Sequence, residues 1–360
     1  MNFDKYNLGF NFENTFINLS KSLRTEVNPT PVKFPKLMIF NNELAKNLDL
    51  DFNLSAKSKI ATILSGNNLI NNEGCISQAY AGHQFGHLTM LGDGRAILLG
   101  EHVTLKNQRF DIQLKGSGLT PYSRNGDGRA TLISMLREYL ISEAMNKLKI
   151  PTTRSLSVIS TGEYIQREKL YMGGILTRVA SSHIRIGTFQ YLSMKGDFLS
   201  LNKLINYCLK RHYPSEEIKI NPSVTLLRLL IKKQISLIVQ WMKVGFIHGV
   251  MNTDNVTISG ETIDYGPCAF MDTYKPSTVF SSIDRTGRYS FQNQPIITHW
   301  NISRFAETMI PFFDENEKKS IEIGTNIIDE FEDIYKNEWT EMMKNKIGIF
   351  NNKKDDTTLI

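Results

Sequence analysis

Alternating apolar and polar positions predict strands in the first half of the chain. Residues 110–115 alternate between the two classes, as expected for a strand with one buried face. Residues 96–99 are apolar and follow a Gly-Asp-Gly turn, which predicts a second strand. Residues 154–161 and 164–171 predict two more, joined at Thr161-Gly162. These segments favour an antiparallel sheet.

Apolar residues that recur every three or four positions predict helices elsewhere. A long helix is expected at residues 224–244, and two further helices at 300–307 and 320–344. An amphipathic helix is expected at residues 131–148. Its apolar face consists of Leu132, Met135, Leu136, Leu140 and Met145.

Composition indicates a globular protein that binds small anions. The 360 residues are 41% hydrophobic and 22% charged, and the chain is long enough for two lobes. The formal charge of +6 suits nucleotides but is too small and dispersed to indicate nucleic-acid binding. We expect no membrane partner, because no run approaches roughly 18 apolar residues, and the first residues resemble neither a secretory signal nor a transit peptide. Three cysteines without metal or disulfide spacing favour a reducing, cytoplasmic compartment.

The segment from His248 to Asn255 has the spacing of a kinase catalytic loop. In the kinase pattern H-R-D-x-x-x-x-N the third residue is the catalytic Asp, whereas this chain has Val250. The metal-binding end of the pattern is present and the usual base is absent. We therefore expect nucleotide chemistry that differs from ordinary phosphorylation.

A divalent cation is expected close to this segment. Residues 257–259 and 262–264 predict a short hairpin around Gly260 that places Asp264 at the end of a strand. Mg²⁺ prefers hard oxygen ligands such as carboxylates, together with nucleotide phosphates. Asn255 and Asp264 are the candidate ligands for Mg²⁺ or Mn²⁺.

Lys115 and Glu138 form a second kinase-like signal. In kinases a strand Lys holds phosphate oxygens and is paired with a Glu of the following helix. The alternative is a surface Lys and a solvated Glu, but the later position of Asp264 has the right order for a kinase-like site. Arg178 and Arg185 could bind phosphate oxygens through their planar guanidinium groups, or could be ordinary surface arginines.

The order of these features predicts an α+β, two-lobed, protein-kinase-like fold. The small lobe would be an antiparallel sheet with one key helix, and the larger lobe mainly helical. The expected parts are an N-terminal extension packed on the small lobe (1–75), the small lobe (76–190), the large lobe (191–345) and a polar tail (346–360).

His83 and His87 have the i, i+4 spacing of a zinc-binding helix. The H-E-x-x-H mechanism needs a Glu after the first His, and this chain has Gln84 there. Gly82 and Gly86 also argue against a helix. We interpret the segment as a packed turn that supports a nucleotide-binding loop.

Four longer segments give a resemblance to a known family. They are YAGHQFGHLTMLGDGRA (80–96), DIQLKGSGLTPYSRNGDGRA (111–130), GGILTRVASSHIRIGTFQ (173–190) and HGVMNTDNVTISGETIDYGP (248–267). The chain resembles the selenoprotein O family of protein adenylyltransferases, which have a pseudokinase fold. The resemblance extends over most of the chain.

The resemblance implies binding of ATP in a reversed orientation and transfer of AMP to protein hydroxyl groups, with release of pyrophosphate. It implies that Asn255 and Asp264 hold the metal, that Asp254 is the proton acceptor and that Glu138 pairs with Lys115. The nucleotide-binding positions that it implies are Gly92, Gly94, Arg95, Lys115, Asp127, Gly128, Arg178, Arg185 and Asp264. For Asp254, the alternative is a structural role in which its side chain caps the loop.

Members of this family usually continue into a C-terminal region with a Cys or selenocysteine, so we expect no redox switch of that kind here. Two other functions stay open. Kinase-type phosphotransfer is disfavoured by Val250, and a non-catalytic nucleotide-binding pseudokinase is disfavoured by the presence of Lys115, Asn255 and Asp264.

Overall fold

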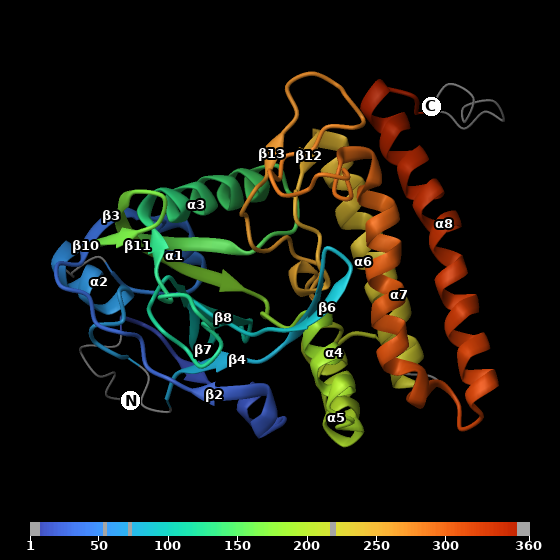
Figure 1. Ribbon diagram of the computed structural model, residues 1–360, viewed down its shortest axis with the longest axis horizontal. Helices are drawn as coiled ribbons and strands as arrows, with labels where there is room; N and C mark the ends of the chain where they lie inside the picture. The colour runs from blue at the N-terminus through green and yellow to red at the C-terminus, as the bar shows by residue number, and fades with distance from the viewer. Residues whose placement is uncertain (1–7, 53–55, 71–73, 217–220, 351–360) are drawn as a thin grey trace. The chain divides into compact units, whose positions relative to one another are not determined.

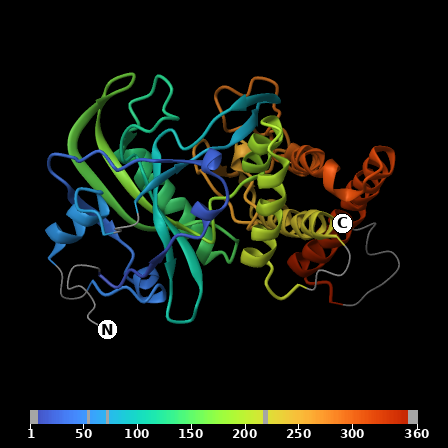
Figure 2. The same ribbon diagram turned by 90° about the horizontal axis from the view of Figure 1, so that it is seen from below.

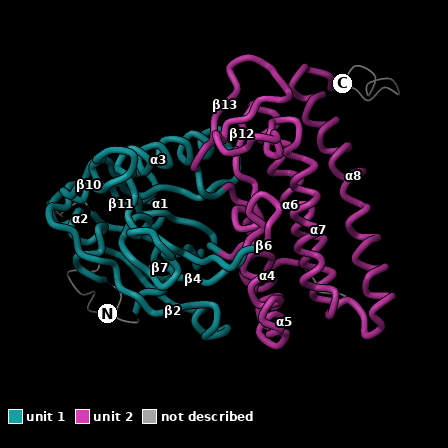
Figure 3. Tube along the Cα trace, in the orientation of Figure 1, with its two compact units in different colours: residues 1–81, 89–183, 263–265 teal, residues 82–88, 184–262, 266–360 magenta. Residues whose placement is uncertain are grey.

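The computed structural model describes residues 8–52, 56–70, 74–216 and 221–350. The chain divides into two compact units, which are coloured separately in Figure 3. Unit 1 comprises Met1–Ala81, Thr89–His183 and Ile263–Tyr265. Unit 2 comprises Gly82–Leu88, Ile184–Thr262 and Gly266–Ile360. The expected tail lies outside the described residues from position 351 onward.

Unit 1 contains an antiparallel sheet with the strand order β2-β4-β7-β8-β11-β10-β3 (Figure 1). In addition, β1 pairs with β7, and β9 pairs with β11. The strands are β1 (Phe12–Glu13), β2 (Arg24–Glu26), β3 (Lys36–Phe40), β4 (Ile76–Gln78), β7 (Ala96–Val103), β8 (Arg109–Lys115), β9 (Ala130–Thr131), β10 (Arg154–Gln166) and β11 (Leu170–Ala180). The predicted antiparallel sheet is confirmed, and segments before residue 75 contribute strands to it.

The predicted strand junction at Thr161-Gly162 is wrong. Strand β10 continues through it, and its pairing with β11 shifts register between Ser160 and Tyr164. Gly162 has a φ of +72°, a conformation that glycine adopts readily. The residue therefore forms a bulge inside a long strand, and the chain reverses only after Gln166.

Helix α3 (Leu132–Lys147) packs on β10 and β11. Thr131 caps its first turn by accepting a hydrogen bond from the Ser134 amide. The predicted apolar face is wrong at Leu140, which is 67% exposed. The buried stripe instead runs through Met135, Glu138, Ser142 and Met145, so the helix buries a carboxylate.

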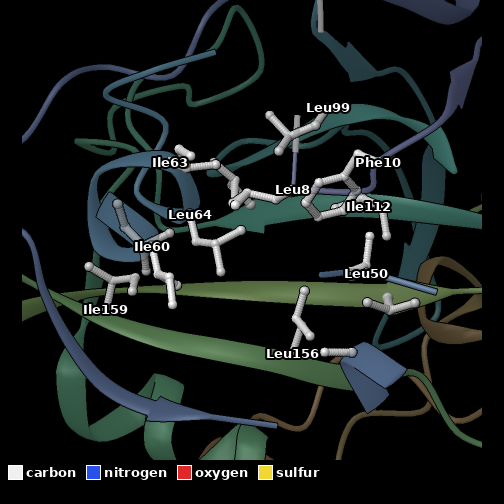
Figure 4. Packing of buried hydrophobic residues seen from close by; sticks show 14 of the residues in the cluster. Leu8, Phe10, Leu50, Ile60, Ile63, Leu64, Leu99, Ile112, Leu156 and Ile159 are labelled. Carbon is white, nitrogen blue, oxygen red and sulfur yellow. The ribbon is translucent and has the colours of Figure 1, made fainter. Parts of the chain in front are cut away.

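The hydrophobic core of unit 1 lies where the N-terminal helices α1 (Asn42–Asn47) and α2 (Lys57–Leu64) cover the sheet. Figure 4 shows side chains from the first 64 residues, including Phe10, Leu50 and Leu64, beside Ile112 and Leu156 of the sheet. Burial of each such side chain contributes about 1.5–3 kcal/mol to stability. This core holds the strand that carries Lys115.

Unit 2 is mainly helical, and its helices α6, α7 and α8 lie side by side (Figures 1 and 2). Asn221 caps α6 and Gly245 ends it with a φ of +69°. The helices predicted at 224–244, 300–307 and 320–344 are confirmed. The elements are α4 (Ile186–Met194), α5 (Phe198–His212), α6 (Pro222–Val244), α7 (Gln294–Phe313), α8 (Glu317–Ile347), the paired strands β5 (Ala81–Gln84) and β6 (His87–Met90), and the paired strands β12 (Phe246–Ile247) and β13 (Ala269–Phe270).

Short 3₁₀ turns complete the elements, at Phe16–Asn18, Lys21–Leu23, Thr253–Asn255 and Phe291–Asn293. The hairpin predicted around Gly260 is wrong. Thr257 forms an isolated bridge with Arg185 instead, and its hydroxyl closes the turn by donating to the carbonyl oxygen of Glu261 and accepting from that residue's amide. Within the described residues, none of the helices has the length and apolar character needed to cross a membrane.

Candidate active site

Four buried or half-buried charged side chains meet in unit 1. Lys115 Nζ lies 2.7 Å from Glu138 Oε2 and 2.8 Å from Asp264 Oδ1. Arg178 NH1 lies 2.6 Å from Asp264 Oδ1 and 3.4 Å from Glu138 Oε1. We call this group the Lys115 cluster. Two cations face two anions, so the cluster is neutral overall, and the alternative of a surface Lys and a solvated Glu is wrong.

Local structure explains why these side chains converge. Lys115 and Arg178 are on the paired strands β8 and β11, and Glu138 is on the buried stripe of α3. The prediction that Asp264 lies at the end of a strand is wrong. The residue lies in a loop, and its φ is +60°. This left-handed conformation is uncommon for residues other than glycine and is concentrated at functional sites. The next residue, Tyr265, is buried and hydrogen-bonds the Thr152 hydroxyl.

Gln113 links the cluster to the glycine-rich turn. Its Oε1 accepts hydrogen bonds from Arg178 Nε at 3.2 Å and from Arg178 NH2 at 2.5 Å. Its Nε2 donates to Asp93 Oδ2 at 3.2 Å. Asp93 lies in the predicted nucleotide-binding turn, and its carboxylate also accepts the amide of Gln78. The turn and the Arg178 guanidinium are therefore held by one chain of hydrogen bonds.

Side chains are excluded at both glycines of this turn. A Cβ at Gly92, which has a φ of +145°, would lie 2.4 Å from the Tyr122 ring. A Cβ at Gly94 would lie 2.8 Å from the Tyr122 carbonyl oxygen. Arg95 follows with an exposed side chain. The glycines are needed because Tyr122 packs directly on the backbone of the turn.

Asp127 and Gly128 lie in a neighbouring loop. Both oxygens of Asp127 are 2.8 Å from the guanidinium of Arg167, and hydrogen bonds from that group hold the pKa of the carboxyl below its usual range. Gly128 packs on Gly118, because a Cβ there would lie 2.0 Å from the Gly118 carbonyl oxygen. Among the described residues, the structure records no contact between Asp127 and the Lys115 cluster.

In unit 2, the β5–β6 hairpin packs on residues 252–254. The His83 amide donates to Thr253 Oγ1 at 2.7 Å, and the Phe85 amide donates to Asn252 Oδ1 at 3.1 Å. A Cβ at Gly82 would lie only 2.2 Å from Asp254 Oδ1. The segment YAGHQFGH is therefore a hairpin, and it supports the loop that contains Asp254.

Gln190 of α4 completes this support. Its Oε1 accepts from Thr253 Oγ1 at 2.7 Å, and its Nε2 lies 2.8 Å from His83 Nδ1. Burial lowers the pKa of His83, and the nearby Arg304 lowers it further, so the ring is neutral near pH 7. Within the described residues there is no group of three or more His, Cys, Asp or Glu side chains arranged to hold a metal.

Arg185 and Asn255 also belong to this loop. Arg185 is buried, and its NH1 donates to the Asp254 carbonyl oxygen at 2.7 Å. The alternative of surface arginines is therefore wrong for both Arg178 and Arg185. Asn255 Nδ2 donates to the Val250 carbonyl oxygen at 2.9 Å. That bond fixes the amide and leaves Oδ1 as its oxygen donor, which suits a hard cation.

The sequence indicates the charged residues of this site but not three polar or small ones beside them. Gln113, Gly82 and Gln190 contact Arg178, Asp254 and Thr253 across long distances in sequence, and so position the candidate side chains. Gln113 could have been found because it lies two residues before Lys115 and so on the same face of one strand. Gly82 could have been found because a glycine inside a strand often marks a close approach of another group.

Comparison with known proteins gives consistent results. The family model described as "Protein adenylyltransferase SelO" matches residues 7–360. A protein of Pelagibacter ubique is 55% identical over 353 residues, which cover 98% of this chain and 73% of that protein. One from Clostridium beijerinckii is 55% identical over 356 residues (99% and 73%), and one from Brevibacillus brevis is 54% identical over 352 residues (98% and 72%). All three are named protein nucleotidyltransferase YdiU.

Proposed function

The chain belongs to the SelO family of protein adenylyltransferases and is a nucleotidyltransferase, and we propose that it transfers AMP from ATP to Ser, Thr or Tyr hydroxyls of proteins, releasing pyrophosphate. In this proposal the fold is the two-lobed pseudokinase fold, with unit 1 as the small lobe and unit 2 as the large lobe. The observation that carries the proposal is the Lys115 cluster, which joins the strand Lys, the helix Glu and the metal-binding Asp of the kinase pattern.

Lys115 and Arg178 act on the phosphate groups. Attack at the α-phosphorus develops negative charge on the leaving pyrophosphate, and fixed cations stabilise that charge in the transition state. Glu138 and Gln113 keep the two cations oriented before ATP arrives. Gly92 and Gly94 let Tyr122 pack directly on the backbone of the turn, so the turn that faces the nucleotide in this proposal is held in a fixed conformation.

Asn255 and Asp264 would hold Mg²⁺ or Mn²⁺. Both offer the hard oxygen donors that these ions prefer, and the Asn255 amide is already fixed with its nitrogen on Val250. When bound, the ion draws charge from phosphate oxygens.

Asp254 accepts the proton of the attacking hydroxyl. Arg185 donates to its carbonyl oxygen and Gly82 leaves room for its carboxylate, so the loop presents the group in a fixed position. General-base assistance of this kind typically contributes about 10²–10⁴ in rate. We assign Arg185 to positioning this loop, and we assign Asp127 to positioning its own loop through Arg167.

Incubation with ATP labelled at the α- or γ-phosphate tests the proposal. We expect α-label on protein together with free pyrophosphate. Label from the γ position would instead indicate phosphotransfer, and the absence of both labels would indicate a nucleotide-binding pseudokinase. The Asp254→Asn variant should lose transfer, whereas Asp272→Asn, at an exposed position of unit 2, should retain it.

A further inference from the structure

A second group of cations lies in unit 2, around Trp300. The guanidinium carbon of Arg288 is 4.6 Å from the centre of the Trp300 ring, and that of Arg304 is 5.3 Å from it. The His83 ring meets the same indole edge-on at 5.1 Å. We call this group the Trp300 cluster. Cation–π attraction holds both guanidinium groups beside one ring.

The charges of this cluster are not balanced. Within the described residues, Nε and NH2 of Arg288 and Nε of Arg304 are buried and have no hydrogen-bond acceptor. Arg304 has an ion pair with Glu307 at 2.6 Å, whereas Arg288 has no ion pair with a carboxylate in the part of the chain that the structure describes. A buried donor without an acceptor destabilises the folded state, and a charged donor does so more strongly. An anion bound here would remove that cost.

Arg288 is held in place by its backbone. The Asp284 carboxylate accepts the amides of Arg288 at 2.9 Å and of Tyr289 at 2.8 Å. Asn293 Nδ2 donates to the Gly287 carbonyl oxygen at 2.8 Å. A guanidinium presented by a fixed loop loses little conformational entropy when it binds a partner.

The cluster is connected directly to the loop of Asp254. Tyr289, next to Arg288, donates its hydroxyl to Asn252 Oδ1 at 2.6 Å, and Asn252 precedes Asp254 by two residues. On the other side, His83 follows Gly82, whose backbone touches the Asp254 carboxylate. Arg288 is therefore linked to the loop of the proposed proton acceptor through its neighbour Tyr289, and His83 is linked to it through its neighbour Gly82.

On the basis of the proposed function, we propose that the Trp300 cluster binds an acidic side chain of the acceptor protein, a few residues from the hydroxyl that receives AMP. The substrate class is then Ser, Thr or Tyr in an acidic sequence. Arginine is suited to this task because its planar fork binds a carboxylate through two parallel hydrogen bonds. The nucleotide phosphates are assigned to Lys115 and Arg178, so the Trp300 cluster is available for the protein substrate.

Binding of peptides to the full chain tests this proposal. Each labelled peptide has one Ser and either Glu or Gln at one of the flanking positions, and fluorescence anisotropy gives its Kd. We expect Glu to strengthen binding by about tenfold or more at one or two positions. Arg288→Gln should reduce that preference to less than about twofold, and Arg304→Gln should weaken it. Arg285→Gln removes the same charge from an exposed position of the same loop and should preserve the preference.

Three results would overturn the proposal. One is equal binding of all Glu and Gln peptides. Another is equal strengthening by Glu at every position, which indicates attraction to the overall positive charge of the protein. The third is a preference that persists when both Arg288 and Arg304 are replaced in variants whose circular dichroism shows the native fold.

Transfer of α-label to the same peptides separates this inference from the proposed function. We expect Arg288→Gln to raise KM for the acidic peptide by about tenfold with little change in kcat, because the lost contact is a binding contact. A failure of all peptides and proteins to accept α-label refutes AMP transfer, while the binding measurements still decide whether the Trp300 cluster recognises acidic side chains.

Discussion

The Lys115 cluster of unit 1 and the Trp300 cluster of unit 2 both hold two buried or half-buried cations, but only in the first does each cation contact a carboxylate. Lys115 and Arg178 share Glu138 and Asp264 at 2.6–3.4 Å. In the Trp300 cluster both guanidinium groups lie against one aromatic ring, and Arg304 pairs with Glu307. Among the described residues Arg288 has no carboxylate partner, and buried donor atoms of both arginines have no acceptor.

The difference teaches how a protein prepares two kinds of binding. A neutral cluster is stable before its ligand arrives, and it keeps the side chains proposed to act on the nucleotide oriented. A cluster with more cations than anions retains hydrogen-bond donors without acceptors, which makes the folded state less stable than one in which every donor is paired. An anionic ligand that supplies the missing acceptors binds more tightly for the same reason. The following substitutions test whether the two clusters differ in this way.

The largest effect is expected for Asp264→Ala. The substitution removes a proposed metal ligand and one of the two anions of the Lys115 cluster, so α-label transfer should fall by about 10³-fold or more. Asp264→Asn is the companion variant, because Asn tolerates the left-handed backbone better than Ala does. Unchanged turnover with Mg²⁺ in both variants contradicts the site, and Asp272→Ala serves as the exposed control.

Lys115→Ala should reduce transfer by about 10²–10³-fold, because a cation aimed at developing charge is lost. Circular dichroism should show that the fold is retained, since Arg178 still lies 3.4 Å from Glu138. Lys106→Ala, on the exposed turn between β7 and β8, should behave as wild type. A wild-type rate for Lys115→Ala would remove this residue from the nucleotide site.

Glu138→Gln should lower the free energy of unfolding by about 3 kcal/mol, because two buried cations then share one carboxylate. Urea denaturation measures the loss. The matched control is Glu143→Gln on the same helix, whose half-buried pair with Arg154 is expected to contribute less. Equal losses in the two variants would show that the Lys115 cluster does not depend on its charge balance.

Arg288→Gln should change the free energy of unfolding by less than about 1 kcal/mol in the absence of substrate. The lost cation–π contact is offset by removal of a buried charge without an acceptor. Urea denaturation alongside Glu138→Gln gives the direct contrast between the two clusters. A loss as large as that of Glu138→Gln would mean that Arg288 has a mainly structural role.

The smallest effect is expected at the surface pair of Asp127 and Arg167, whose side chains are 44% and 37% exposed. Solvent screens such pairs, so Arg167→Ala should cost about 1 kcal/mol or less at neutral pH. The folded-state pKa of Asp127 lies below its ordinary value of 3.8. The contribution is therefore present above that value and disappears as the pH falls through the folded pKa. Urea denaturation at neutral and acidic pH should show the variant and wild type converging in acid.

The local sequence pattern was sufficient to predict a strand or helix wherever its buried residues are apolar and regularly spaced. Strand β8 and helix α6 were predicted from alternation and from apolar periodicity, and the latter also has clear end signals at Asn221 and Gly245. The pattern failed at Leu140, because α3 buries Glu138 and Ser142 on the face where apolar residues were expected. The spacing of hydrophobic residues cannot predict that the Glu138 carboxylate is buried, because its burial depends on the ion pair with Lys115.

Contacts between distant residues account for most of what was missed. Thr253 lies 170 residues after His83, yet the two are joined by a hydrogen bond. Gly162 is a residue type typical of turns, but β10 pairs with β11 both before and after it, so the position becomes a bulge within one strand. Lys115, Glu138 and Asp264 were identifiable because their order follows the kinase pattern, whereas the neutral residues that orient them carry no such signal.

The bare backbone at Gly82 has a consequence for how this protein can evolve. Hydrogen is the only side chain that fits between this residue and the Asp254 carboxylate, so even one added methyl group must rotate or displace the proposed proton acceptor. Lineages that abandon nucleotide transfer lose that restriction. A bulkier residue at this single position should therefore mark inactive copies in sequence surveys, before any of their charged residues has drifted.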